Sequence, residues 1–92
     1  MSHNSNKKRW VILEHRVTKD TIEGRHYDLL LEGNLACRTW RLEDLPELDG
    51  LPVGAIAIES HKLVWLERKE AFVSGGRGWA KRILGGIFFG SL

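Results

Sequence analysis

The 92-residue chain carries 14 Lys and Arg residues against 12 Asp and Glu residues, and 42% of its residues are hydrophobic. These values are typical of a globular domain and exclude a disordered or collagen-like chain. The net charge of +2 at pH 7 is too small to attract nucleic acid through a global field, so any such affinity must come from local clusters of basic residues.

The chain begins with a polar tail and a first strand. Residues 1–9 are polar and basic, with too few apolar groups to offset the cost of ordering them, so we expect a disordered tail. Structure should begin near Trp10, and residues 10–92 should form a single domain. Residues 10–15 are rich in β-formers and the polar stretch 16–25 contains Gly24, which predicts a strand followed by a loop.

The next segment predicts a hairpin. Strands at residues 26–32 and 35–42 flank Gly33 and Asn34, which accept the positive φ angles of a two-residue turn. Because side chains alternate with period two, one face of this hairpin is mostly apolar and the other gathers the polar residues. On the polar face, the two-residue turn pairs His26 with Arg41, Asp28 with Thr39 and Leu30 with Cys37.

The second half of the chain predicts short strands separated by turns. Residues 43–54 contain two prolines and predict a connection with one short helical turn at 43–48. Residues 79–84 and 87–89 form either strands or a short terminal helix. The absence of a long 3.6-residue apolar period indicates a mainly β fold, for which we predict a small closed antiparallel β-barrel with short helical turns. The remaining expected elements are strands at 55–59, 62–67 and 71–73, a break near Ser60 and a turn at 74–78.

Cysteine content and hydropathy bear on the compartment. A single cysteine, Cys37, excludes an intrachain disulfide and a Cys-rich zinc site, and it suits a reducing compartment. The N-terminus lacks the apolar stretch of a signal peptide, and no window approaches the roughly 20 apolar residues that cross a bilayer. We therefore expect a cytoplasmic monomer without membrane contact.

Histidines and one aspartate form the pattern that points to chemistry. His26 and Asp28 project from one face of a predicted strand, about 6.6 Å apart along the backbone, so both can reach one ion. His15 and His61 lie at a strand end and a strand break, and their imidazoles are suitable ligands for a mixed His and carboxylate site. Each histidine taken alone is an ordinary surface or hydrogen-bonded residue. Together with an aspartate in a strand, where aspartate is disfavoured, they indicate a metal site.

The same residues resemble a known family. The pattern runs from His15 through His26-Tyr27-Asp28-Leu29-Leu30-Leu31-Glu32 and Thr39-Trp40-Arg41-Leu42 to His61 and Trp65. It resembles the 3′-phosphoesterase domain of bacterial DNA ligase D and its small stand-alone relatives, over residues 10 to 78. The resemblance implies a compact β-barrel with a polar groove that trims 3′-phosphates or 3′-terminal ribonucleotides from nucleic-acid ends. It also implies DNA ligase or other repair proteins as partners.

The resemblance assigns roles to four of these residues. It implies that His15, Asp28 and His61 bind Mn²⁺ or another divalent transition metal, and that His26 acts at the scissile phosphate. Such an ion acts as a Lewis acid on a phosphate oxygen. The histidine at the phosphate can donate a proton to the leaving oxygen or bind the phosphate itself.

Three further residues, Arg41, Trp65 and Arg77, complete the expected site. Leu30 stands where the ligase D enzymes have a phosphate-binding arginine, and the hairpin register suggests Arg41 as its substitute, although a solvated strand charge is the ordinary interpretation. Trp65 replaces a family tyrosine, keeps an aromatic ring and is a candidate for stacking on a base. Arg77, in a glycine-rich turn, is a candidate phosphate contact.

Two other functions fit the sequence. The changes at Leu30 and Trp65 favour a catalytically inactive barrel that binds nucleic-acid ends or a repair partner, and manganese-dependent turnover separates this alternative from the enzyme. His26, Asp28 and His61 also match the two-histidine, one-carboxylate triad of non-haem iron oxygenases, although such enzymes are usually much longer.

Overall fold

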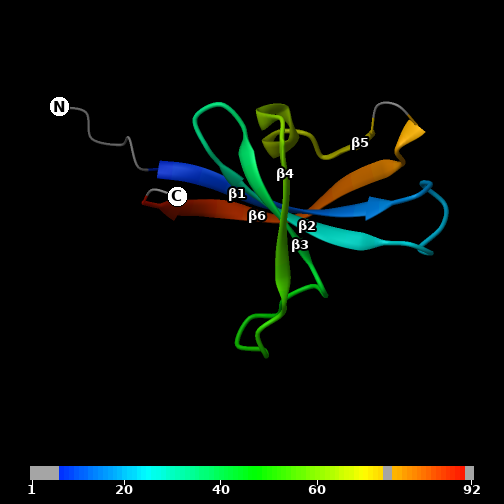
Figure 1. The fold of residues 1–92 in the computed structure, drawn as a ribbon, viewed down its shortest axis with the longest axis horizontal. Coiled ribbons are helices and arrows are strands. Elements are labelled where there is room, and N and C mark those ends of the chain that lie inside the picture. Colours follow the sequence, from blue (N-terminus) through cyan, green and yellow to red (C-terminus); the bar gives the residue numbers. More distant parts are fainter. Residues whose placement is uncertain (1–6, 74–75, 91–92) are drawn as a thin grey trace.

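Six antiparallel strands and one 3-10 helix form the structure, a computed structural model that describes residues 7–73 and 76–90 (Figure 1). The predicted mainly β fold is therefore confirmed. Within these residues no helix is long and apolar enough to span a membrane. Residues 1–6 of the predicted tail and 74–75 of the predicted turn lie outside the described residues. The elements are β1 (Lys7–Arg16), β2 (His26–Glu32), β3 (Cys37–Leu42), β4 (Ala55–His61), η1 (Leu63–Leu66), β5 (Glu70–Phe72) and β6 (Trp79–Phe89).

All six strands belong to one antiparallel sheet, in the order β4-β3-β2-β1-β6-β5. The closed barrel is not confirmed, because β4 and β5 are edge strands and no pairing joins them in the described part of the chain. In Figure 1, β4 crosses the long β1–β6 pair at a steep angle, as expected of a strongly twisted sheet. β5 has only three residues and offers a short edge for closure.

The two terminal strands are longer than the sequence predicts. β1 begins at Lys7, three residues before the expected start, because its first residues pair with the end of β6, where Lys7 lies opposite Phe89. β6 is one continuous strand, so the alternative of a terminal helix is wrong. Ile12 pairs with Leu84 and Leu13 with Arg82, which leaves one extra residue on β6 as a β-bulge.

The β2–β3 hairpin has a wider turn than predicted. The loop contains four residues, 33–36, and a hydrogen bond from the Gly33 N–H to the Ala36 carbonyl (3.0 Å) closes it. Every predicted pair is therefore shifted by two residues, and Asp28 lies opposite Arg41. A shift by two keeps each side chain on its predicted face, because the side-chain period is two.

The apolar run after β4 is helical. Residues 63–66 form η1, so the predicted strand at 62–67 is wrong. In η1 the adjacent Trp65 and Leu66 both pack on the core, whereas in a strand they would point to opposite faces. The predicted helical turn at 43–48 is not found in the structure either, and this stretch, which contains Pro46, is irregular.

The sheet has two unlike faces. We call the face that η1 covers the inner face, and the other the outer face. Many of the alternating side chains of β1, β2 and β3 that point to the inner face are almost fully buried, including the Asp28 carboxylate, and those nearer the strand ends are partly exposed. The predicted polar face of the hairpin is thus the buried one. The core on this face consists of Val11, Leu13, Leu30, Cys37 and Leu66, with Leu63 and Trp65 packed against it.

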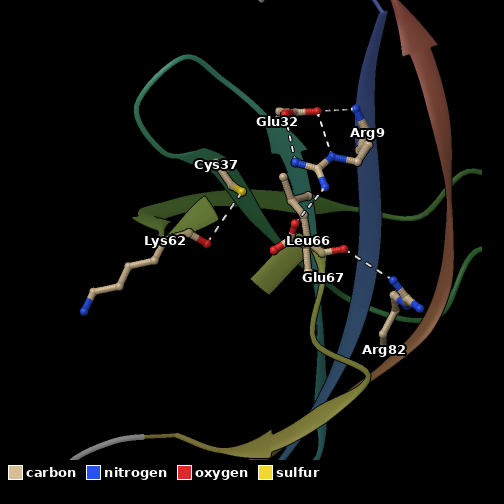
Figure 2. A network of polar contacts seen from close by, with 7 residues as sticks. All are labelled: Arg9, Glu32, Cys37, Lys62, Leu66, Glu67 and Arg82. Carbon is tan, nitrogen blue, oxygen red and sulfur yellow. Dashed lines mark hydrogen bonds and ion pairs between the residues drawn. The ribbon is translucent and has the colours of Figure 1, made fainter. Parts of the chain in front are cut away.

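Polar contacts fasten η1 and the residues after it to the sheet (Figure 2). Arg9 of β1 donates to Glu32 through Nε (3.2 Å) and Nη2 (3.1 Å), and its Nη1 lies 3.7 Å from Oε1 of Glu67. These hydrogen bonds from Arg9 hold the pKa of Glu32 below its usual value. Arg82 of β6 donates from Nη1 to the Leu66 carbonyl (3.3 Å). The helix is therefore held from both β1 and β6.

Cys37 should be chemically inert in the folded protein. It is fully buried, and burial raises the pKa of its thiol to about 11. Because the thiolate is the reactive form, we expect iodoacetamide at mildly alkaline pH to leave the native protein unmodified and to alkylate it fully in denaturant. Mass spectrometry of the two samples measures this. Rapid labelling of the native protein would contradict the burial of β3.

Candidate functional site

One pocket on the inner face, about 180 Å³ in volume, brings together all the residues predicted to carry chemistry. Five of them come from β1 to β4, one from η1 and one from the loop between β5 and β6. These seven are His15, His26, Asp28, Arg41, His61, Trp65 and Arg77, and Leu13, Val73 and Ala80 form the apolar part of the wall.

The Asp28 carboxylate is the most buried polar group in this pocket, at 4% exposure. Its Oδ2 lies 3.6 Å from Nε2 of His26 and 4.0 Å from Nε2 of His61. Its Oδ1 lies 3.5 Å from Nε of Arg41 but accepts no hydrogen bond from the described residues. A buried carboxylate is costly unless it is paired and hydrogen-bonded, and Oδ1 of Asp28 lacks a hydrogen bond from the described residues.

Strand register explains most of this arrangement. Asp28 and Arg41 lie directly opposite each other on β2 and β3, and His15 lies opposite His26 on β1 and β2. Opposite residues in an antiparallel pair share a face of the sheet. His26 and Asp28 share that face because they are two residues apart. Four pocket residues therefore follow from the pairing of three adjacent strands.

His61 reaches the pocket because of a β-bulge in β4. Ile58 pairs with Thr39 and His61 pairs with Cys37, so this stretch of β4 has one residue more than the facing stretch of β3. In a regular ladder Ser60 would lie opposite Cys37 and His61 would point to the outer face. The extra residue returns His61 to the inner face, a use of bulges that is common next to active sites.

Backbone carbonyls set the tautomers of two histidines. Nδ1 of His61 lies 3.3 Å from the Glu59 carbonyl oxygen, which can only accept, so Nδ1 donates and Nε2 of the neutral ring carries the lone pair. That lone pair is on the nitrogen that faces Asp28. In the same way, Nε2 of His15 donates to the Arg77 carbonyl (2.7 Å). Metal-binding histidines commonly use one nitrogen in this manner.

The surroundings of His26 disfavour its protonated form. Burial lowers its pKa, the Asp28 carboxylate offsets this only in part, and Arg41 and His15 lower it further. Its ring packs on that of His15, with centroids 4.6 Å apart and planes tilted by 47°. The expected role of His26 as a proton donor therefore requires that it first take up a proton.

The donors fit a divalent transition metal in chemical type. Among the described residues, the imidazole nitrogens within 4.0 Å of the Asp28 carboxylate belong to His26 and His61, so the predicted ligand His15 is not the nearest. Ligand atoms of one ion lie roughly 3 to 3.5 Å apart, because each lies about 2.1 Å from the metal. The observed gaps are wider, and no group of three or more His, Cys, Asp or Glu donors within residues 7–73 and 76–90 has metal-binding spacing. The side chains would therefore have to move closer together to bind an ion.

Arg68 is a neighbour of the pocket that sequence reasoning missed. Its guanidinium lies 5.0 Å from the ring centroid of Trp65. Residues three apart eclipse each other in a 3-10 helix, which brings Arg68 back over Trp65 just after η1 ends. The strand expected at residues 62–67 gave no indication that the side chains of Trp65 and Arg68 would be in contact.

Gly78 directly follows Arg77, whose backbone carbonyl accepts a hydrogen bond from His15. Its φ is +102°, and a Cβ there would collide with the Arg16 carbonyl oxygen. We expect Gly78→Ala to lower the free energy of unfolding by about 2 kcal/mol or more. Gly76→Ala is the matched control, since φ is also positive (+68°) but the space is open, and it should cost about 1 kcal/mol. Urea unfolding measures both, and equal losses would contradict the collision.

The pocket combines donor atoms with positively charged side chains. Imidazoles and a carboxylate are suitable cation ligands, and Arg41 and Arg77 add positive charge at the same place.

A scan against models of known protein families finds no match to this chain, and a search of curated proteins finds no similar sequence.

Proposed function

We propose that this protein is a metal-dependent phosphoesterase that removes 3′-phosphates or 3′-terminal ribonucleotides from nucleic-acid ends in DNA repair. The observation that carries the proposal is the buried Asp28 carboxylate, flanked by His26 and His61 in a pocket that also holds Arg41. The residue pattern and the twisted antiparallel sheet resemble the barrel of the ligase D 3′-phosphoesterase domain, which supports the same reaction. We place the protein in the cytoplasm, as a monomer that works with DNA ligase or other repair proteins.

Asp28 and His61, with His15 as the third ligand that the family resemblance implies, would hold Mn²⁺ or another divalent transition metal, so that the lone pair of His26 stays available for a proton. When bound, such an ion supplies a Lewis acid that offsets the negative charge developing on the phosphate oxygens. His15 packs against the His26 ring and so helps to fix the orientation of that ring. Nδ1 of His61 is held by the Glu59 carbonyl, which keeps the lone pair of this ring on the Asp28 side.

Arg41 binds the phosphate in the proposed reaction. Its side chain is 49% exposed although Nε lies beside the buried Asp28, so the rest of the guanidinium is accessible from the pocket. A guanidinium can donate two parallel hydrogen bonds to a phosphate. Arg77 contributes a second positive charge, and the Trp65 ring offers a surface for the terminal base.

His26 moves the proton. Its neutral ring can accept a proton from the attacking water as the new phosphorus–oxygen bond forms. The protonated ring then returns this proton to the 3′-oxygen as the old phosphorus–oxygen bond breaks. Water is consumed, and a 3′-hydroxyl and inorganic phosphate are the products.

Phosphate release from a 3′-phosphorylated oligonucleotide tests the proposal. We expect turnover with Mn²⁺ and none with a chelator. Arg41→Ala should lower kcat/KM by roughly 10²- to 10³-fold, the usual effect of removing one donor to a developing negative charge. Arg38→Ala removes the same charge from the outer face, where Arg38 packs over Trp40, and should leave turnover unchanged. No turnover with any divalent transition metal would overturn the proposal.

An inactive protein that binds nucleic-acid ends or a repair partner is the second candidate. Two observations favour it. Leu30, which stands at the position of an arginine in the ligase D enzymes, is fully buried in the core. Trp65 lacks the hydroxyl of the tyrosine that the family has at its position. Tight binding of the 3′-phosphorylated oligonucleotide without turnover would support this candidate.

A non-haem iron oxygenase is the third candidate. It is favoured by the two imidazoles nearest to Asp28, those of His26 and His61, which make up the two-histidine, one-carboxylate set of that class. This function predicts oxygen uptake that depends on Fe²⁺ and an organic cosubstrate. An oxygen electrode measures it, and the phosphoesterase predicts no uptake.

A further inference from the structure

A second groove, about 840 Å³ in volume, continues from the pocket along β4, η1 and β5. The two hollows share Arg41, His61 and Trp65 in their walls, so one leads into the other. The reaction proposed above uses only the pocket. The groove therefore needs a separate explanation.

The groove concentrates positive charge. Its wall carries four cationic side chains, Arg41, Lys62, Arg68 and Arg77, against one carboxylate, Glu59, among the described residues that line it. The whole chain has a net charge of only +2, so this groove is more positive than the chain as a whole, although Arg41 also pairs with the buried Asp28. A cleft lined by one sign of charge raises the local concentration of an oppositely charged ligand.

Aromatic residues accompany these cations. Trp65 and Phe72 both line the groove, and Phe72 is 71% exposed on the edge strand β5. A ring so exposed adds little to the core. Basic grooves with aromatic side chains are typical of proteins that bind single-stranded nucleic acid, because cations follow the phosphates and rings stack on the bases. Paired bases within a duplex are stacked on one another and are not available to a ring.

We propose that this groove binds the unpaired 3′ overhang of a nucleic acid, with Lys62 and Arg68 on internal phosphates and Phe72 on a base. The direction of the strand rests on the proposed function, since the pocket receives the terminal phosphate. The inference adds a strand geometry to that function. The protein selects a single-stranded 3′ end over a duplex end.

Fluorescence anisotropy in the presence of a chelator tests the groove separately from the chemistry. The probe is a labelled oligothymidylate of about 12 nucleotides with a 3′-hydroxyl, a length within the range that small single-strand binding domains cover. We expect it to bind more tightly than a duplex of equal length. The Asp20→Asn variant, which changes an exposed carboxylate in the loop between β1 and β2, should bind it as well as the wild type does.

Variants of the groove should weaken this binding in two ways. Lys62→Ala combined with Arg68→Ala should flatten the slope of log affinity against log salt by about 1.4, because each phosphate contact contributes about 0.7 for single strands. Phe72→Ala should weaken binding roughly 5- to 100-fold, and Phe72→Trp should retain it. The matched controls are Arg38→Ala, on the outer face, and Phe89→Ala, equally exposed (70%) near the end of β6, and both should bind normally.

Several results would overturn the inference. The first is equal affinity for single strand and duplex, and the second is an equal effect of Arg38→Ala and of the double variant at Lys62 and Arg68. The third is full binding by Phe72→Ala together with complete competition by inorganic polyphosphate. Failure of the groove and failure of the proposed function are distinguishable. Single-strand binding without metal-dependent turnover removes only the phosphoesterase, and turnover without single-strand preference removes only the groove.

Discussion

Replacing Asp28 with Asn should abolish the stabilisation of this protein by Mn²⁺ while leaving the metal-free protein as stable as the wild type or more so. The carboxylate is buried and its Oδ1 accepts no hydrogen bond from the described residues, so the neutral amide relieves a cost in the absence of metal. For the wild type, Mn²⁺ at about 100 times its Kd should add about 2.7 kcal/mol. That corresponds to a rise in Tm on the order of 10 °C or more for a domain of this size.

Thermal unfolding of both proteins with and without Mn²⁺ measures this effect. Asp20→Asn is the matched control, because Asp20 is exposed in the loop between β1 and β2 and the change in charge is the same. It should keep the full Mn²⁺ response. An unchanged response of Asp28→Asn would remove Asp28 from the metal site, and a large loss of stability without metal would assign it a structural role instead.

Leu30→Ala should destabilise the protein by about 2 to 5 kcal/mol, the usual cost of removing a fully buried leucine side chain. Leu30 is 0% exposed and packs in the single core cluster of the inner face. Small domains have total stabilities of roughly 5 to 15 kcal/mol, so this loss is a large part of the whole. Urea unfolding measures it.

Leu35→Ala is the control for this prediction. Leu35 is 93% exposed in the hairpin loop, and its truncation should change the stability by no more than about 0.5 kcal/mol. Similar effects of the two variants would contradict the position of the core. The burial of Leu30 also explains why an arginine cannot occupy this position here, since its charge would be placed among apolar side chains.

Much of the candidate site could be predicted because strand periodicity survives errors in register. The predicted hairpin turn was two residues too short, yet Asp28 and Arg41 remained on one face because an even shift preserves facing. The pairing of His15 with His26 depends on the register of β1 and β2 and not on the turn between β2 and β3. These residues therefore meet whether or not the turn is identified correctly.

Other features depend on contacts that local sequence does not encode. The strand at 62–67 was a reasonable expectation from its apolar residues, but packing of Trp65 and Leu66 against the core favours the helical η1. Closure of a sheet depends on whether its two edges meet, and β5 is only three residues long. The start of β1 at Lys7 depends on a partner residue, Phe89, that lies more than 80 residues later in the chain.

Because of the bulge in β4, the place of His61 opposite Cys37 does not require one fixed number of residues before it in the strand. Since the extra residue lies between Ile58 and His61, loss of that residue together with the bulge would still leave the imidazole opposite Cys37. Moving the histidine by one place at constant length would instead turn it away from Asp28. Related chains can therefore differ by one residue in the spacing before this histidine and keep the same constellation, so a search for them should allow a gap there.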